Sequence, residues 1–354
     1  MRLITASLAV MSLAVALAAC RERHAAPPPQ DAPASLSPAA TMSAAPAVAT
    51  PSAPALTAAS ASPTAVANAA PDAGCAPARP HTPGDSDGTL RSGGLDRTYV
   101  LHVPPSYDGT RRTPLVLNLH GFGSNGRQQA LYSRMPQKAD AEGFLTVAPD
   151  GAGEPRRWTF PGLGDVDDVA FLSALLDDLE ARLCVDPDWV FVTGMSNGAG
   201  FATMLACALP GRFAAIAPVA ATAYTPACDG TPPLPVISFR GTDDRCVPYD
   251  GGTTACGLGL PVRPAEEAVR LWAAHDGCNP EPARQRRREH VRTTAYSECR
   301  DNVAVVLFTI EGGGHTWPGA VAVPRLGVTS TEVDATDEIW QFFVASATIR
   351  AARH

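Results

Sequence analysis

The chain has 354 residues, a formal net charge of -7 at pH 7 and 45% hydrophobic residues. The net negative charge argues against a nucleic acid as the partner. No aromatic residue precedes Tyr99, so the material for a hydrophobic core lies in the C-terminal part of the chain. That part, roughly 260 residues long, is enough for one α/β domain with a complete core.

The first twenty residues have the pattern of a targeting segment. Arg2 is followed by a mostly apolar run from residue 3 to residue 17, which is too short for a comfortable membrane span. The sequence Leu-Ala-Ala before Cys20 resembles a bacterial lipoprotein signal, with cleavage before the cysteine and lipid on its sulfur. An ordinary secretory signal with an incidental cysteine is the alternative. We therefore predict an exported protein anchored through Cys20 and, because Arg21 resembles the outer-membrane sorting pattern, an outer-membrane location; without the anchor it is periplasmic or secreted.

Composition divides the chain into three parts. From residue 21 to about residue 73 the chain is mostly Ala, Pro, Ser and Thr, which cannot bury enough apolar surface to offset the entropy lost on ordering. We predict a signal peptide at residues 1–19, a disordered tether at residues 20–80 and a catalytic domain at residues 81–354.

The chain contains nine cysteines, and eight remain when Cys20 is set aside. An even number in an exported protein predicts disulfides, although eight cysteines allow 105 pairings. We expect four disulfides, with Cys278 and Cys299 as one pair. Metal binding is the weaker interpretation, because the sequence has no C-x-x-C or H-x-x-x-H cluster. The eight cysteines are Cys75, Cys184, Cys207, Cys228, Cys246, Cys256, Cys278 and Cys299.

The order of elements predicts an α/β fold with a mostly parallel central sheet and helices on both faces. Asp167 and Asp168 precede a leucine stripe at helical spacing and are expected to start that helix. Pro264 and Gly277 bracket a second helix. A third apolar stripe marks a closing helix near the C-terminus. The first and third stripes, predicted to be core, comprise Leu172, Leu175, Leu176, Leu179, Leu183, Ile339, Phe342 and Phe343.

An early apolar strand at residues 115–119 runs directly into His120, Gly121 and Phe122. Gly121 lets the backbone approach a neighbouring loop, and the Phe122 N–H is the expected donor to a developing oxyanion. His120 is a possible second base. A base of this kind is expected after the nucleophile in the sequence, and His120 comes before Ser196. We therefore predict instead that His120 holds this loop by hydrogen bonding.

A second apolar strand, at residues 189–193, leads into Ser196, and a helical stretch follows. Gly194 and Gly198 flank the serine, as a strained strand-to-helix turn requires, because the strand and helix pass close together there. The pattern predicts that Ser196 is a nucleophile and that the N–H of Asn197 is the second oxyanion donor. A glycine-flanked turn without catalytic function is the alternative.

A serine hydroxyl is a poor nucleophile at neutral pH, so the prediction requires a base and an acid. After this kind of turn they follow the serine in the order acid, then histidine. His315 follows a continuous apolar run at residues 303–310 and is the predicted base; the alternative is a histidine that only caps a flexible loop. The acid follows a strand at residues 234–239, where position alone does not separate Asp243 from Asp244.

The predicted site residues belong to a longer series of segments along the chain. These segments are residues 97–99 with 103–104, 119–121, 167–171, 194–198, 241–249 and 314–319. Together they resemble the esterase family that joins polyhydroxybutyrate depolymerases and feruloyl esterases, a branch of the α/β-hydrolases. The resemblance implies the α/β-hydrolase fold and favours Asp244 over Asp243 as the acid. The chain departs from the family pattern in having Arg240 where a histidine is usual and Ala199 where a second glycine is usual.

The resemblance implies a serine carboxylic-ester hydrolase that needs no cofactor, with feruloyl or acetyl esters of polysaccharides or hydroxyalkanoate polyesters as substrates. Trp158 and Trp317 are predicted to line the substrate pocket, since aromatic faces suit a feruloyl ring or an apolar polyester. The alternative is that one or both rings pack in the core. Acyl transfer to an alcohol, or a non-catalytic binding module on the same scaffold, are the rival functions.

Overall fold

The computed structural model of the chain describes residues 74–257 and 259–353. The predicted signal peptide, Cys20 and residues 20–73 of the predicted tether lie outside the described residues. Within the described part, no helix combines the length and the apolar character needed to cross a bilayer.

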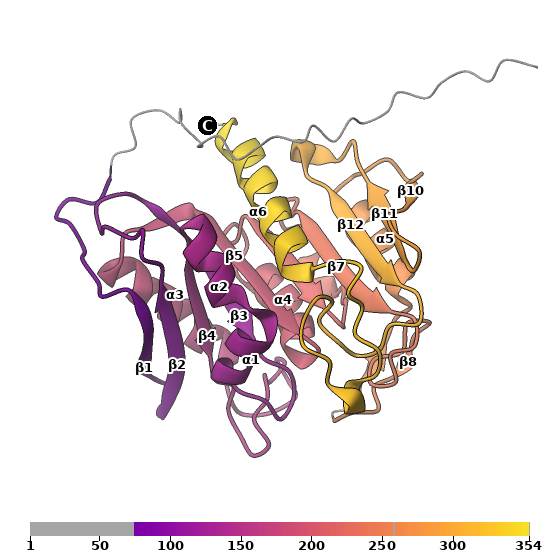
Figure 1. Cartoon of the computed structure of the whole chain (residues 1–354), viewed down its shortest axis with the longest axis horizontal. Coiled ribbons are helices and arrows are strands. Elements are labelled where there is room, and N and C mark those ends of the chain that lie inside the picture. The colour runs from indigo at the N-terminus through magenta and orange to yellow at the C-terminus, as the bar shows by residue number, and fades with distance from the viewer. Residues whose placement is uncertain (1–73, 258, 354) are drawn as a thin grey trace, which may run out of the picture. The chain divides into compact units, whose positions relative to one another are not determined.

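Ten strands form one sheet in the order β1-β2-β4-β3-β5-β6-β7-β12-β11-β10 (Figure 1). The six central strands, β4 to β12 in that order, pair in parallel. The strands at both edges pair antiparallel. The strands are β1 (Gly84–Ser92), β2 (Leu95–Val103), β3 (Thr113–Leu119), β4 (Leu145–Pro149), β5 (Val185–Met195), β6 (Ala215–Val219), β7 (Val236–Gly241), β10 (Ala283–Arg286), β11 (Val291–Tyr296) and β12 (Val305–Ile310), with β8 (Gly252–Thr253) and β9 (Pro261–Val262) forming a separate pair.

Helices cover both faces of the sheet, so the predicted α/β architecture is confirmed (Figure 1). Alternate residues of β3 show the two sides: Leu115 and Leu117 belong to the buried cluster that includes residues of α3, α4 and α5, whereas Val116 belongs to the cluster that includes residues of α2 and α6. This alternation follows from the two-residue period of a strand buried on both faces. The helices are α1 (Gly126–Ser133), α2 (Met135–Glu142), α3 (Asp168–Arg182), α4 (Asn197–Ala208), α5 (Ala265–His275) and α6 (Ala335–Ala351).

Helix α3 starts as predicted at Asp167, whose side chain accepts a hydrogen bond from the Ala170 N–H at 2.9 Å. Asp168 has a larger role than the predicted one. Its buried carboxylate pairs with Arg97 of β2 at 2.6 Å and accepts the Thr159 N–H at 2.7 Å. Burial raises the pKa of Asp168, while the Thr159 N–H and Arg97 oppose that rise. Asp168 therefore joins the helix to β2 and to the segment before the helix.

The predicted boundary between tether and domain at residues 80 and 81 is wrong. Cys75 forms a disulfide with Cys184, at the start of β5. Arg79 donates a hydrogen bond to the Leu183 carbonyl at 3.0 Å, and its own carbonyl accepts one from Tyr107 Oη at 2.7 Å. The domain therefore includes the chain from at least Cys75, because covalent and polar contacts fix this segment even though its composition is tether-like.

Among the described residues four disulfides are present, as predicted, and the expected pair Cys278–Cys299 is confirmed. The remaining bridges are Cys75–Cys184, Cys207–Cys228 and Cys246–Cys256. In the chain-entropy model a bridge stabilises a fold by restricting the unfolded chain, and more so for a longer loop. The Cys75–Cys184 bridge, which spans 109 residues, is therefore expected to contribute most, about 4–5 kcal/mol.

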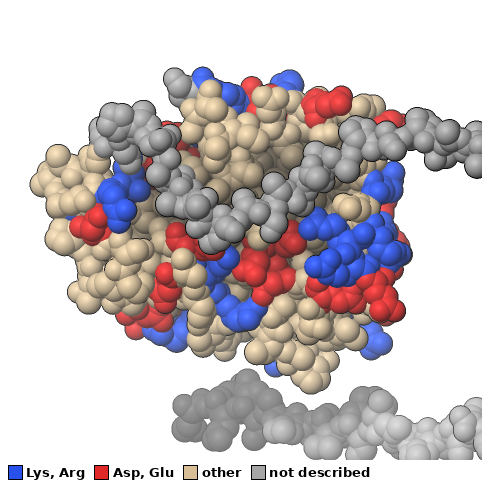
Figure 2. Space-filling model, turned by 45° about the horizontal axis from the view of Figure 1, so that its top comes forward, with Lys and Arg blue, Asp and Glu red and all other residues tan. Residues whose placement is uncertain are grey.

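Basic and acidic side chains lie next to one another on the face shown in Figure 2. The end of β10 and the turn after it show the same alternation of charge, because Arg286 pairs with Glu311 at 3.0 Å and Arg287 with Glu338 at 3.5 Å. On this face the described residues therefore form no continuous basic field of the kind that attracts phosphate backbones.

Candidate active site

Four of the predicted site segments follow parallel strands at the same end of the sheet: Phe122 follows β3, Ser196 follows β5, Asp244 follows β7 and His315 follows β12. In open α/β sheets, loops at the carboxyl ends of the strands form the usual ligand site. The topology therefore brings together side chains that lie up to almost 200 residues apart in sequence.

Ser196 lies in a sharp turn between β5 and α4, with φ 57° and ψ -117°. Such a backbone conformation is strained for a residue other than glycine and persists only when its surroundings enforce it. The Ser196 N–H donates to the Val219 carbonyl at 2.9 Å. A Cβ on Gly194 or Gly198 would lie 2.8 Å or 2.4 Å, respectively, from the Leu119 carbonyl oxygen. Both flanking glycines are therefore required by close packing, as the sequence pattern predicted.

The His315 side chain donates from Nδ1 to Asp244 Oδ2 at 2.8 Å, and both side chains are buried. The other carboxylate oxygen of Asp244 accepts the N–H groups of Cys246 and Val247, each at 2.8 Å. Three hydrogen bonds thus fix this carboxylate. Asp243 is exposed and does not contact the histidine. The structure therefore places Asp244, and not Asp243, against His315.

Ser196 and His315 line the same cavity. Among the described side chains the Ser196 hydroxyl has no hydrogen-bond partner, so the serine–histidine contact is not made in this structure. Contacts of this kind are often long in enzymes without substrate and tighten in the complex.

The two predicted oxyanion donors are the N–H groups of Phe122 and Asn197. Gly121 packs against Ser196, since a Cβ on that glycine would lie 3.4 Å from Ser196 Cβ. Phe122 and Asn197 line a cavity together with Ser196. Within residues 74–257 and 259–353, neither the Phe122 N–H nor the Asn197 N–H has a backbone acceptor. Both donors are therefore available to an oxygen bound next to the serine.

His120 holds the loop at residues 120–122 by hydrogen bonding, as predicted, and is not positioned as a second base. Its Nδ1 donates to the Gly121 carbonyl at 2.7 Å and its Nε2 accepts the Gly151 N–H at 2.8 Å. Burial lowers the pKa of His120, which agrees with a neutral ring that donates from one nitrogen and accepts at the other.

The structure places Trp158 and Trp317 in the core rather than on a pocket wall, which corrects the prediction for both. Trp158 is fully buried, and its Nε1 donates to the His120 carbonyl at 2.9 Å. Its backbone N–H donates to Asn197 Oδ1 at 2.7 Å. Trp317 is 1% exposed, and its Nε1 donates to Thr336 Oγ1 at 2.9 Å. Each indole points inward to an acceptor distant in sequence, and Trp158 supports the loop that carries Phe122.

Two cavities open beside Ser196. The larger, of about 840 Å³, is lined by His315, Leu131, Tyr132, Val323, Arg325 and Leu326 among others. The smaller, of about 170 Å³, is lined by Asn197, Phe160, Ala221, Val247, Leu260 and Val262 among others. Phe122 and the Cys246–Cys256 disulfide line both cavities. Leu131 and Tyr132 of α1 and the residues at 323–326 lie in segments that carry no motif, so sequence reasoning missed them.

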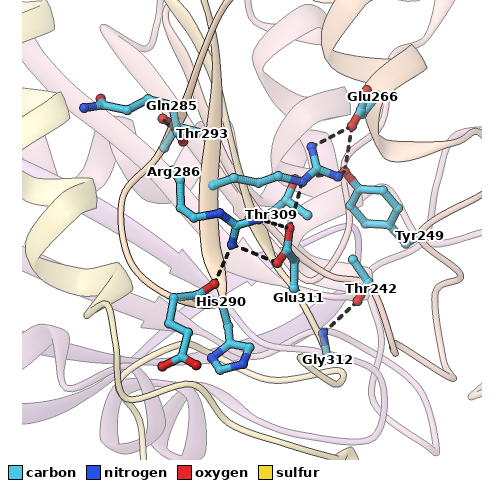
Figure 3. A network of polar contacts seen from close by, with 12 residues as sticks. Thr242, Tyr249, Glu266, Gln285, Arg286, His290, Thr293, Thr309, Glu311 and Gly312 are labelled. Atoms are coloured by element: carbon cyan, nitrogen blue, oxygen red, sulfur yellow. Dashed lines mark hydrogen bonds and ion pairs between the residues drawn. The ribbon is translucent and has the colours of Figure 1, made fainter. Parts of the chain in front are cut away.

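The acid loop (residues 242–249) and the histidine loop (residues 311–319) are joined directly. Asp243 N–H donates to the Gly313 carbonyl at 2.9 Å. Thr242 Oγ1 accepts the Gly312 N–H at 2.8 Å, a contact visible in Figure 3. These bonds fix the two loops relative to each other before substrate arrives.

A polar network continues behind these loops (Figure 3). Tyr249 of the acid loop shares a hydrogen bond with Thr309 of β12 at 2.8 Å and donates to Glu266 of α5 at 3.3 Å. Arg286 donates to both oxygens of Glu311, at 3.0 and 3.1 Å, at the start of the histidine loop. The arginine–glutamate pair is largely solvent-exposed and contributes little, whereas the buried Tyr249–Thr309 contact ties the acid loop to the sheet.

The two departures from the family pattern are both buried. Ala199 packs with Ala221, Cys246 and Val247. Arg240 is 1% exposed, and its Nη2 donates to the carbonyls of Val247 at 2.9 Å and Pro248 at 3.1 Å. Both departures therefore contact the acid loop.

Among the described residues, Asp244, Cys246 and His315 form a cluster of metal-ligating side chains. Cys246 is oxidised in a disulfide, and Asp244 and His315 bind each other. The ligand atoms of this cluster are therefore already engaged.

Comparison with known proteins places the chain in a family. The model of the family Esterase PHB depolymerase matches residues 97–246, which include Ser196 and Asp244. The putative esterase NocK of Nocardia uniformis subsp. tsuyamanensis is 33% identical over 279 residues, covering 71% of this chain and 80% of that protein. Feruloyl esterase C of Emericella nidulans is 30% identical over 259 residues, covering 71% and 84%. The chain belongs to this esterase family.

The esterase also resembles a longer protein in sequence and a solved structure in fold. It is 31% identical over 229 residues to feruloyl esterase B of Piromyces equi. The aligned region covers 62% of this chain but only 42% of that protein. The acetyl xylan esterase from Aspergillus awamori has a TM-score of 0.50 at 17% identity, covering 73% of this chain and 99% of that one. This likeness confirms the α/β-hydrolase fold. The esterase is a carboxylic ester hydrolase.

Proposed function

We propose that the esterase acts through a catalytic triad of Ser196, His315 and Asp244. The observation that carries the proposal is the 2.8 Å hydrogen bond from His315 to a fully bonded Asp244 carboxylate, beside a serine in a strained turn. In the reaction His315 takes the Ser196 proton as the hydroxyl attacks the ester carbonyl. Asp244 holds Nδ1–H, so that Nε2 is the nitrogen that accepts the proton.

The Phe122 and Asn197 N–H groups stabilise the oxyanion in this scheme. Each is positioned by a fixed element: the Phe122 loop by His120, and Asn197 by the start of α4. One such donor is typically worth about 10²–10³ in turnover. His315 then activates the water that hydrolyses the acyl-enzyme, and the scheme needs no cofactor.

The substrates that fit are esters with an apolar or aromatic acyl group. Both cavities have mainly apolar linings, and the relatives carry the names feruloyl esterase, acetyl xylan esterase and PHB depolymerase. We propose feruloyl or acetyl esters of polysaccharides, or hydroxyalkanoate esters, as the substrate class. Side-by-side rates on methyl ferulate, acetylated xylan and short hydroxybutyrate oligomers decide among them.

A fluorophosphonate probe tests the nucleophile directly. We expect the probe to inactivate the enzyme at one label per molecule, because an activated serine attacks phosphorus and the oxyanion donors stabilise the adduct. Peptide mass spectrometry should place the label on Ser196. Inactivation with the label on another residue, or full labelling of Ser196 without loss of activity, would contradict the proposal.

The four disulfides favour an exported enzyme, because thiols in most cytosols are kept reduced. Attachment to a membrane through Cys20 stays a prediction, since that residue lies outside the described part of the chain.

A further inference from the structure

The two cavities beside Ser196 are lined by different residues of the proposed catalytic site. His315 lines the larger cavity and not the smaller, whereas Asn197 lines only the smaller. With the triad proposed above, on which this inference rests, the histidine gives its proton to the oxygen of the leaving alcohol. The alcohol half of the ester therefore lies on the His315 side, in the larger cavity, and the acyl half lies in the smaller one.

The larger cavity carries one permanent charge. Arg325 lines it from the short helical turn η3 (Pro324–Leu326), and no carboxylate is among its described lining residues. Within residues 74–257 and 259–353 the Arg325 guanidinium has no ion-pair partner, unlike Arg286 or Arg287. A guanidinium without a protein partner is free to bind an anionic group of the substrate.

The segment that carries Arg325 is fixed against the catalytic histidine. The His315 N–H donates to the Leu326 carbonyl at 2.7 Å, and the Gly314 N–H donates to the Val328 carbonyl at 2.9 Å. A Cβ on Gly314 would lie 2.4 Å from the Leu326 carbonyl oxygen, so the two backbones are in close contact. The backbone of Arg325 is therefore held at a constant position relative to the group that protonates the leaving alcohol.

We propose that Arg325 selects esters whose leaving alcohol carries a carboxylate, as does the hydroxy acid released from the end of a hydroxyalkanoate oligomer. Water cleaves the acyl–oxygen bond of such an ester, releasing one carboxylic acid and one hydroxy acid. The guanidinium binds the carboxylate of the leaving half through charge-assisted hydrogen bonds. A neutral sugar as the leaving group gains nothing from this cation.

Two matched substrates test the proposal: 3-acetoxybutyrate and its amide, which share an acyl group and differ only in the charge of the leaving half. We expect a kcat/KM ratio of about fivefold to tenfold in favour of the carboxylate, as an exposed charge-assisted contact provides. Arg325→Gln should bring the ratio near one, Arg325→Glu should invert it, and Arg325→Lys should retain part of it. The wild-type ratio should fall as salt screens the charge.

Arg284→Gln is the matched control, because Arg284 is an exposed arginine of β10 that does not line the cavity. It should leave the ratio at the wild-type value. Equal wild-type rates on both substrates, or a ratio that Arg325→Gln leaves intact, would overturn the proposal. Loss of all activity in Ser196→Ala shows separately that the measured hydrolysis uses the proposed triad, so the two proposals fail by different results.

An independent observation concerns Arg240, at the end of β7. Its guanidinium is buried, and in the described structure its Nε and Nη1 have no hydrogen-bond partner. A buried cation with incomplete pairing is costly to the fold. What it does contact is the acid loop, through the carbonyls of Val247 and Pro248. Val247 is also one of the two residues whose N–H groups hold Asp244.

The charge of Arg240 also acts on the acid. The ionisable groups that face the guanidinium are Asp244 and Tyr249, and no direct ion pair joins it to Asp244 among the described residues. Tyr249 is in turn linked to Glu266 and Arg292. Burial lowers the pKa of Arg240, and the attraction of Asp244 opposes that effect.

We infer that Arg240 is a positioning residue that shapes the acid loop around Asp244. Its hydrogen bonds to the carbonyls of Val247 and Pro248 hold the stretch of backbone that binds the Asp244 carboxylate. Without these bonds kcat should fall, because Asp244 is held less firmly against His315, while KM should change little.

Arg240→Lys keeps a hydrogen-bond donor at the end of the side chain, and Arg240→Met removes it. We expect both variants to lose thermal stability, with Arg240→Lys retaining part of the wild-type kcat and Arg240→Met losing most of it, while KM stays near the wild-type value in both. Arg240→Gln is a second variant without the guanidinium if Arg240→Met does not fold. A folded Arg240→Met enzyme with the wild-type kcat, or equal losses of kcat in Arg240→Lys and Arg240→Met, would reduce Arg240 to a structural role.

Discussion

Replacing Ser196 with alanine is expected to abolish ester hydrolysis while leaving the fold intact. The hydroxyl is the bond-forming group in the proposed reaction, and triad knockouts typically cost several powers of ten in turnover. Removing the hydroxyl disturbs little packing, because the side chain lies at the mouth of the two cavities and makes no hydrogen bond among the described residues. The measurement is the rate on a p-nitrophenyl acyl ester together with the melting temperature.

Thermal stability should change little in this variant, because alanine keeps the Cβ and the strained backbone conformation of the turn. Residual activity above about 1% of wild type, measured on a folded variant, would show that Ser196 is not the nucleophile. Loss of activity together with loss of folding would instead point to a structural role for the turn.

Replacing Asp244 with asparagine is expected to lower turnover by about 10⁴. The amide still accepts the two N–H bonds from the acid loop at one atom, but the group facing His315 Nδ1 is no longer an anionic acceptor. The imidazole then adopts the wrong tautomer for accepting the serine proton. Steady-state kcat at pH 7 to 8 measures the effect.

The adjacent Asp243 supplies the matched control. It has the same chemistry one position away, but it is exposed and does not contact His315. Asp243→Asn should therefore change kcat by less than about threefold, in line with the small effect of most surface substitutions. The reverse ranking of the two variants would refute the assignment of the acid.

The parts of the site that could be predicted from the sequence are those that depend on local backbone geometry. A strand, a serine between glycines and a helix form one continuous segment, so the turn at Ser196 is encoded within a few residues. The order of the acid and the histidine after later strands follows from the parallel sheet. Adjacent aspartates could be separated only by family resemblance, because which of them faces His315 depends on a second loop.

The parts that could not be predicted depend on contacts between distant segments. Whether Trp158 faces the pocket or the core is decided by the carbonyl of His120. The ion pair of Asp168 with Arg97 joins residues 71 positions apart. The attachment of the segment at Cys75 depends on Cys184, 109 positions later, which composition around Cys75 does not reveal.

The Cys246–Cys256 disulfide links three parts of the site through one covalent bond. The N–H of Cys246 holds Asp244, both sulfur-bearing residues form the wall shared by the cavities, and the following Gly257 packs against the Phe122 ring, with a Cβ position 2.9 Å from it. The loop of Asp244, the cavity wall and the loop of Phe122 are therefore connected through the same oxidation step. A newly made chain needs an oxidant to form this bond, so full activity is expected only after Cys246 and Cys256 have been oxidised.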